Sequence, residues 1–170
     1  MDLRAYIRDV PDFPKPGIMF KDITPLLRSP KALRETVERL AQPFRSERVT
    51  SVAAIESRGF IFGSCVARLL DAGFIPIRKP GKLPWTKRRN EYVLEYGTDA
   101  LEIHDDALTP ADRVLIIDDV LATGGTAAAA SALVRGFGAT LVGISMVIEL
   151  TFLDGRKKLD GTTVHSLITY

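Results

Sequence analysis

The amino-acid sequence predicts an α/β protein with an open, mostly parallel twisted sheet flanked by helices. Apolar segments rich in β-branched residues, such as 49–55 and 114–117, alternate along the chain with helix-forming segments. Each of these two strands ends in polar residues and a short turn before the next helix, which is typical of parallel βα units. The 170 residues, 46% of them hydrophobic, are enough to bury a sizeable core, so we expect one domain over 1–170.

Residues 1–28 are expected to form an ordered hood at the N-terminus. Four prolines between 11 and 25 exclude a continuous helix or a central strand there. The segment is too apolar for a free linker, so we expect it to lie against the domain; its apolar residues include Phe13, Ile18, Met19 and Phe20. Two interpretations remain open: an N-terminal arm tucked onto the surface, or a cover over a flat apolar ligand with Phe20 available for stacking.

The first long helix is expected to begin at Ser29-Pro30, with serine as the N-cap and proline at the first helical position. Apolar residues then recur at spacings of 4, 3 and 4, which predicts one buried helix face made of Leu33, Val37, Leu40 and Phe44.

The strand predicted at 49–55 runs into Glu56-Ser57-Arg58-Gly59, and an apolar helix follows over 60–70. The carboxyl ends of parallel strands meet at one sheet edge, so Arg58 is placed near any site at the tip of the 114–117 strand. An arginine in a turn is more often only solvated. Cys65 is expected in the core, on an apolar helix face. It is the single cysteine, which favours a reducing compartment and hence the cytoplasm.

Basic residues follow the short strand predicted at 74–77. Twelve residues without an acid contain Arg78, Lys79, Lys82, Lys87, Arg88 and Arg89. A solvated face and a nucleic-acid surface are both possible readings, but the net charge of +2 is too small to argue for nucleic acid. The cluster begins at the expected ligand edge, which fits binding of a polyanion such as pyrophosphate. The stretch 83–97 is long and polar, and we expect a flexible loop that acts as a lid.

Two adjacent acids, Asp118 and Asp119, follow the buried strand at 114–117, and a loop of small residues at 122–126 precedes an alanine-rich helix. Such a loop directs backbone N–H groups at one point beside a helix N-terminus, which suits a phosphate. The patterns of nucleoside triphosphate P-loops and of dinucleotide folds are missing. Paired carboxylates beside a phosphate suit a sugar phosphate with Mg²⁺. The alternative is an ordinary βα turn with aspartate as a helix cap.

The remaining chain predicts a strand at 101–104, a long buried strand at 140–148, a loop at 149–158 and an edge strand at 164–168. His104 and His165 have neither short ligand spacing nor a cysteine companion, so we expect no metal there. No apolar run reaches membrane-spanning length, so we expect no membrane partner.

The acid pair and the Thr-Gly-Gly-Thr core at 123–126 resemble the motif that binds 5-phosphoribosyl pyrophosphate (PRPP) in type I phosphoribosyltransferases. The resemblance covers nearly the whole chain and implies the fold of that family. It implies that Asp118 and Asp119 hold the ribose and lie near Mg²⁺, which PRPP carries without a direct protein ligand. It also implies that the loop holds the 5′-phosphate through Ala122, Thr123, Gly124, Gly125 and Thr126.

Other segments resemble further motifs of the family. Glu-Ser-Arg-Gly-Phe at 56–60 resembles its pyrophosphate loop, implying that Ser57 and Arg58 bind pyrophosphate. The basic segment 78–82 implies a homodimer, because its cations reach the pyrophosphate of the neighbouring site; they are Arg78, Lys79 and Lys82. Leu-Glu-Tyr-Gly at 94–97 resembles the end of the catalytic loop, implying a catalytic role for Glu95 with Tyr96 beside it. Roles for the basic residues at 87–89 stay open.

The stretch 13–27 resembles the N-terminal signature of the adenine-specific members of the family. This implies transfer of phosphoribosyl from PRPP to adenine, giving AMP and pyrophosphate in purine salvage. Phe20 would stack on adenine, Met19 and Lys21 would contact it through their backbones, and Val120 would line the same subsite. Two alternatives remain: transfer to another purine, or a PRPP-sensing regulator that binds nucleic acid through its basic segment. Such regulators usually append a DNA-binding domain, for which 170 residues leave no room, so no nucleic-acid partner is expected.

Overall fold

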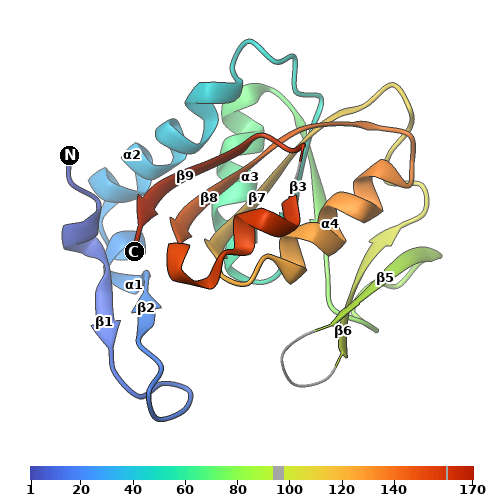
Figure 1. The fold of residues 1–170 in the computed structure, drawn as a ribbon. Coiled ribbons are helices and arrows are strands. Elements are labelled where there is room, and N and C mark those ends of the chain that lie inside the picture. Colours follow the sequence, from blue (N-terminus) through green and yellow to red (C-terminus); the bar gives the residue numbers. More distant parts are fainter. Residues whose placement is uncertain (94–97, 160) are drawn as a thin grey trace.

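Five parallel strands form the central sheet of the protein, seen here in a computed structural model that describes residues 1–93, 98–159 and 161–170 (Figure 1). The strands stand in the order β4-β3-β7-β8-β9 and all neighbours pair in parallel. They are β3 (Ser51–Ile55), β4 (Gly73–Ile77), β7 (Arg113–Leu121), β8 (Thr140–Glu149) and β9 (Val164–Thr169). The predicted fold class is confirmed, and β9 is an edge strand as expected.

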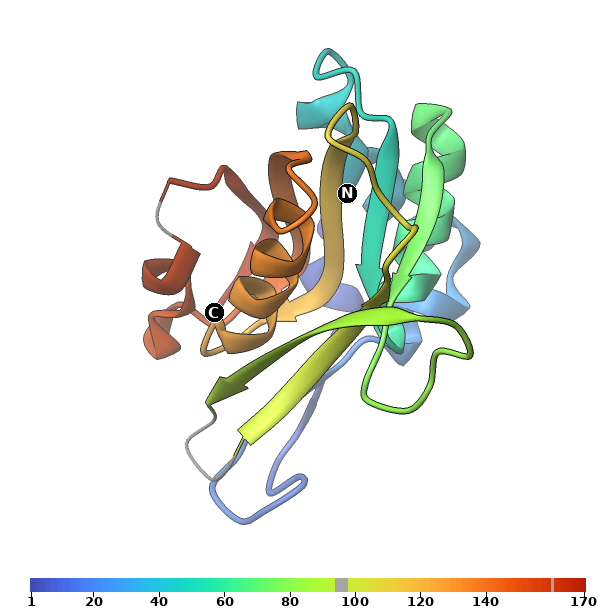
Figure 2. The same cartoon turned by 90° about the vertical axis from the view of Figure 1, so that its right-hand side faces the viewer.

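Helices cover both faces of the sheet (Figure 2). On one face lie α2 (Pro30–Ala41) and α3 (Arg58–Leu70), and on the other lies α4 (Gly125–Arg135). Side chains alternate along β3 accordingly: Val52 and Ala54 pack under α2 and α3, whereas Ala53 and Ile55 pack under α4. Short 3₁₀ turns complete the helical content: η1 (Arg4–Tyr6), η2 (Gln42–Phe44), η3 (Thr151–Leu153) and η4 (Gly155–Leu159).

The helix start predicted at Ser29 is confirmed, because the Ser29 hydroxyl accepts a hydrogen bond from the Ala32 N–H at 3.3 Å. On the same helix Leu40 is fully buried. One expectation about α3 is wrong. Cys65 is exposed, because the buried stripe of α3 runs through Phe62 and Val66 and Cys65 lies off that stripe. The helix ends at Asp71, a left-handed C-cap with φ of 54°, whereas Gly73 already belongs to β4.

The hood contains a short antiparallel pair, β1 (Arg8–Val10) with β2 (Phe20–Asp22), followed by α1 (Thr24–Arg28). Below this pair the chain makes a loop that projects from the domain (Figure 1). Phe13, Ile18 and Met19 are 45–50% exposed, so the expectation that the whole apolar segment lies against the domain is wrong at this tip. Leu3 at the start of the hood, and Ile23 and Leu26 directly after β2, anchor the hood in the core.

An antiparallel two-stranded arm projects from the sheet at the end away from the hood (Figure 1). It consists of β5 (Lys87–Val93) and β6 (Thr98–His104), which pair residue by residue. Much of the segment predicted as a loop over 83–97 is therefore a strand. Its basic side chains conceal the apolar alternation by which a strand is recognised. The predicted catalytic residues Glu95 and Tyr96 lie outside the described residues.

Candidate active site

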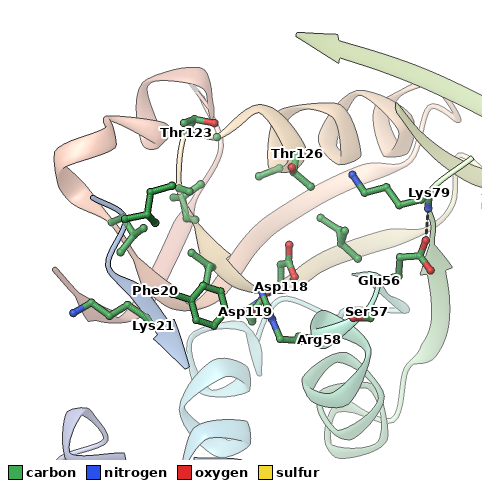
Figure 3. Close-up of a pocket in the computed structure, with 18 of the residues that line it drawn as sticks. Phe20, Lys21, Glu56, Ser57, Arg58, Lys79, Asp118, Asp119, Thr123 and Thr126 are labelled. Carbon is green, nitrogen blue, oxygen red and sulfur yellow. Dashed lines mark hydrogen bonds and ion pairs between the residues drawn. The ribbon is translucent and has the colours of Figure 1, made fainter. Parts of the chain in front are cut away.

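A cavity of about 470 Å³ lies at the carboxyl ends of β3 and β7, beneath the hood (Figure 3). Most of the predicted site residues line it: Met19, Phe20, Lys21, Ser57, Arg58, Lys79, Asp118, Asp119, Val120, Ala122, Thr123, Gly124 and Thr126. Among the predicted residues that the structure describes, three do not line it: Gly125, Arg78 and Lys82. The cavity also has lining residues that sequence reasoning missed: Ile18, Ile55, Glu56, Leu121, Ala127 and Leu150.

The acid pair lies within β7, which continues to Leu121. Asp118 and Asp119 are 8% and 6% exposed, and both line the cavity. The Asp119 carboxylate accepts a hydrogen bond from Arg58, whereas Asp118 Oδ1 accepts only from the Asp119 backbone N–H, at 2.8 Å, among the described hydrogen bonds. Burial, together with the charge of Asp119, raises the pKa of the Asp118 carboxyl well above its usual value. An acid held this way gains most from a ligand that donates hydrogen bonds, such as a sugar hydroxyl.

The first turn of α3 is fitted closely to the acid pair. A Cβ on Gly59 would lie 2.8 Å from Asp118 Oδ1 and 3.1 Å from the Ile117 carbonyl oxygen. Glycine at this position therefore lets the helix start approach the strand. The same approach brings Arg58, the first residue of α3, to Asp119.

The small-residue loop connects β7 to α4, which begins at Gly125. Gly124 has φ of 80°, and a Cβ there would lie 2.1 Å from the Gly155 carbonyl oxygen. A Cβ on Gly155 would in turn lie 2.1 Å from the Ala122 carbonyl oxygen. The loop is thus packed backbone to backbone against η4. It ends at the N-terminus of an 11-residue helix, where backbone N–H groups favour an anion, and Thr123 and Thr126 line the cavity there.

The cations after β4 have partners within the chain. Arg78 pairs with Glu56 at 2.8 Å, and Glu56 also accepts the Lys79 backbone N–H at 2.6 Å (Figure 3). Burial raises the pKa of the Glu56 carboxyl, but these donors outweigh burial and hold it below its usual value. Glu56 is a site residue that sequence reasoning passed over, although its place directly after β3 is the signal that could have found it.

The hood brings Phe20 to the cavity, where its ring lies near the Arg58 side chain (Figure 3). The Arg58 guanidinium lies 5.5 Å from the centre of the Phe20 ring, and Phe13 meets the same ring edge to face at 5.1 Å. The Lys21 side chain is engaged elsewhere, because its Nζ pairs with Asp9 at 2.7 Å. Only the backbone of Lys21 is left to contact a ligand in the cavity.

The described residues contain no group of three or more His, Cys, Asp or Glu side chains placed to hold a metal ion together. Three carboxylates line the cavity: Asp118, Asp119 and Glu56. Arg58 already neutralises Asp119, and Arg78 pairs with Glu56. This set fits a Mg²⁺ that takes most of its ligands from substrate oxygens and water.

Comparison with known proteins agrees with this geometry. Residues 22–164 match the family model described as phosphoribosyl transferase domain. The adenine phosphoribosyltransferase of Gloeobacter violaceus is 57% identical over 171 residues, covering 100% of both chains. The crystal structure of the Thermoanaerobacter pseudethanolicus adenine phosphoribosyltransferase matches with a TM-score of 0.96 and 51% identity, covering 99% of this chain and 98% of that one. The Saccharomyces cerevisiae enzyme, complexed with an imino-altritol bisphosphate and adenine, matches with a TM-score of 0.92 and 39% identity, covering 98% and 96%.

Fold, cavity and family match together define a protein of the phosphoribosyltransferase class. Within that class, the chain belongs to the adenine phosphoribosyltransferase family.

Proposed function

We propose that the protein transfers the 5-phosphoribosyl group of PRPP to adenine, giving AMP and pyrophosphate in purine salvage. One observation carries this proposal: a single cavity joins the Phe20 ring to the acid pair and to the helix N-terminus that follows 122–126. A flat base, a sugar with vicinal hydroxyls and a phosphate need these three kinds of surface. The family membership supports the same reaction.

In this proposal PRPP, the phosphoribosyl donor, lies along β7 and α4. Asp118 and Asp119 accept hydrogen bonds from the ribose hydroxyls, and the N–H groups of 122–126 hold the 5′-phosphate. Gly125 takes part through its backbone as the first residue of α4. Asp118 and Asp119 would face the Mg²⁺ that PRPP carries, and that ion would supply positive charge to the pyrophosphate. Fixing both reactants in one geometry supplies much of the rate.

Adenine lies under the hood. Phe20 stacks on its ring, Met19 and Lys21 contact its edge through their backbones, and Val120 lines the same subsite. Adenine N9 then attacks ribose C1, and the bond from C1 to the pyrophosphate oxygen breaks with its electron pair leaving on that oxygen. The N9 proton is lost to the departing pyrophosphate. The transition state has oxocarbenium character, which exclusion of water protects.

Pyrophosphate is held by Ser57 and Arg58 from its own chain, and by Arg78, Lys79 and Lys82 in a homodimer with shared sites. Arg78 and Lys82 do not line their own chain's cavity, which fits a role toward a neighbouring subunit. Lys79 lines its own cavity as well. We propose a cytoplasmic protein, in keeping with a single unpaired cysteine. None of the described helices is long and apolar enough to cross a membrane.

Glu95 is proposed as the catalytic carboxylate, with Tyr96 beside it. A Glu95→Ala variant is expected to retain PRPP binding and to lose most of kcat; unchanged turnover would remove Glu95 from the mechanism.

A base competition assay tests the proposed function. Pyrophosphate release is measured with PRPP and adenine, hypoxanthine, guanine or xanthine, with Phe20→Leu as the stacking variant and Phe152→Leu as its control. Phe152 is 72% exposed and does not line the cavity. We expect adenine to be preferred, Phe20→Leu to raise the adenine KM about tenfold, and Phe152→Leu to match the unaltered protein. A preference for another purine would change the proposed base. Salt-dependent binding to duplex DNA without turnover would favour the alternative of a PRPP-sensing regulator.

A further inference from the structure

Four polar groups form a continuous hydrogen-bonded chain from the basic segment to the small-residue loop. Lys79 Nζ donates to the Asp99 carboxylate and, at 3.0 Å, to the Tyr92 hydroxyl. The Tyr92 hydroxyl donates to Asp99 at 3.1 Å and accepts from the Thr126 hydroxyl at 3.3 Å. Lys79 and Thr126 both line the cavity, where the Lys79 side chain extends toward Thr126 (Figure 3).

The two middle groups of this hydrogen-bonded series, Asp99 and Tyr92, belong to the arm. Tyr92 on β5 and Asp99 on β6 are directly paired across the two strands. The contacts of Lys79 and Thr126 with them therefore tie the arm to two residues that the proposed function assigns to the phosphates of PRPP. Tyr92 also packs against the core cluster beneath α4, so the arm is fixed at this point by both apolar and polar contacts.

The Asp99 carboxylate is the same kind of hydrogen-bond acceptor for the Lys79 ammonium as a phosphate oxygen would be. Both are anionic oxygens, and an ammonium group has three donors, of which Asp99 and Tyr92 take two. Burial lowers the pKa of Lys79, but its hydrogen bonds to Asp99 and Tyr92 outweigh burial and hold the pKa above its usual value. The group is thus a full cation. The Lys79 and Asp99 side chains are 38% and 28% exposed, so an incoming anion can reach the pair.

We propose that Asp99 is a positioning residue that acts through Lys79: it holds the ammonium on the arm, and the phosphates of PRPP compete with it. PRPP binding then loosens the arm at its Lys79 contact, so donor affinity and arm position are coupled. This inference rests on the proposed function, because it takes PRPP as the anion.

Direct binding of PRPP with Mg²⁺, measured by titration calorimetry, tests the competition. Asp99→Asn removes the charge and keeps the shape, so we expect PRPP to bind about two- to fivefold more tightly, the range that a partly exposed ion pair is worth. Asp99→Glu restores the carboxylate and is expected to return the affinity toward that of the unaltered protein. Tyr92→Phe, which removes only the hydroxyl, is expected to give a smaller gain and serves as a second variant should Asp99→Asn fold poorly.

A double-mutant cycle separates competition from a general charge effect. In a Lys79→Met background, Asp99→Asn is expected to leave PRPP affinity unchanged, whereas a through-space effect of the lost charge would persist there. Glu91→Gln is the matched control: Glu91 lies on the same arm, is 64% exposed and pairs with Arg89, so its removal should not alter PRPP affinity.

Two results overturn the inference alone: weaker or equal PRPP binding by both Asp99→Asn and Tyr92→Phe, or an Asp99→Asn gain that survives the loss of Lys79. A different result, no PRPP binding by the unaltered protein, overturns the proposed function and the inference together.

Discussion

The guanidinium of Arg58, at the first position of α3, donates a hydrogen bond to the carboxylate of Asp119 on β7. The same guanidinium lies near the face of Phe20, so one side chain contacts both the acid pair and the hood (Figure 3). Arg58 therefore connects the part of the cavity proposed for the sugar to the part proposed for the base.

Arg58→Lys is expected to raise the KM for PRPP roughly tenfold and to raise the KM for adenine as well. An ammonium keeps the charge, but it cannot bind Asp119 and lie along the Phe20 ring with one planar group. Steady-state kinetics with each substrate varied in turn measures both effects. Arg68→Lys, the same exchange on an exposed residue of α3, is the control; equal KM values for Arg58→Lys and this control would refute the connecting role.

Asp118→Asn is expected to stabilise the protein at pH 7 while reducing activity at least about tenfold. Because the pKa of Asp118 is raised in the folded state, the native protein holds this proton more tightly than the unfolded chain. Stability contributed by the protonated group is thus lost as the pH rises from the unfolded pKa near 3.8 through the folded pKa. The Tm gain of Asp118→Asn should shrink as the pH falls toward 4. A variant that is less stable than the unaltered protein at pH 7 contradicts this account.

Gly59→Ala tests the close approach of α3 to β7 without changing a charge. The added Cβ would press on Asp118 Oδ1 and on the Ile117 carbonyl, so we expect kcat/KM for PRPP to fall about tenfold. Gly73→Ala is the matched control, since a Cβ there meets the Thr50 carbonyl oxygen at an ordinary 3.7 Å. The kinetics of the two variants are compared once equal Tm values show that both are folded. An unaltered kcat/KM in Gly59→Ala would show that the close approach of α3 to β7 is not needed.

Glu149→Gln is expected to lower stability at neutral pH by about 1 kcal/mol, because its partner Arg156 is half exposed to solvent. Arg156 donates to Glu149 at 2.9 Å and Ser166 donates at 2.7 Å, and these bonds lower the carboxyl pKa despite burial. The stabilisation is present above the unfolded pKa near 4.5 and is lost as the pH falls through the lowered folded pKa.

Thermal unfolding from pH 7 to pH 3 checks this dependence, with Asp154→Asn in the exposed pair with Lys157 as the control. The difference between Glu149→Gln and the unaltered protein should narrow in acid, and a constant difference would assign the effect to packing. Arg156 follows Gly155, which packs on the small-residue loop, so the KM for PRPP should also rise in Glu149→Gln.

The site residues that could be predicted from the sequence lie in a few short segments, each readable by itself. Asp118 and Asp119 lie near the end of β7 and the loop at 122–126 follows it, while Ser57 and Arg58 come after β3, so the parallel-sheet rule alone brings them together. Phe20 was predicted at the site because the hood resembles a known signature. These predictions needed no knowledge of long-range packing.

The features that sequence reasoning missed depend on contacts between distant segments. Glu56 acquires its role from Arg78, and Gly124 fits only because Gly155 lies against it. The β5 segment was predicted as part of a loop because it is recognisable as a strand only by its pairing with β6. Exposure of Cys65 depends on which face of α3 meets the sheet, and the helix is apolar enough around its circumference to conceal that choice.

The central claim is tested most directly by measuring how much AMP and how much pyrophosphate are formed from adenine and PRPP in the same reaction. We predict equal amounts of the two products, formed only when both substrates and Mg²⁺ are present, and strongly reduced in Asp118→Asn. Pyrophosphate released without AMP, or no product from adenine at all, would contradict the account.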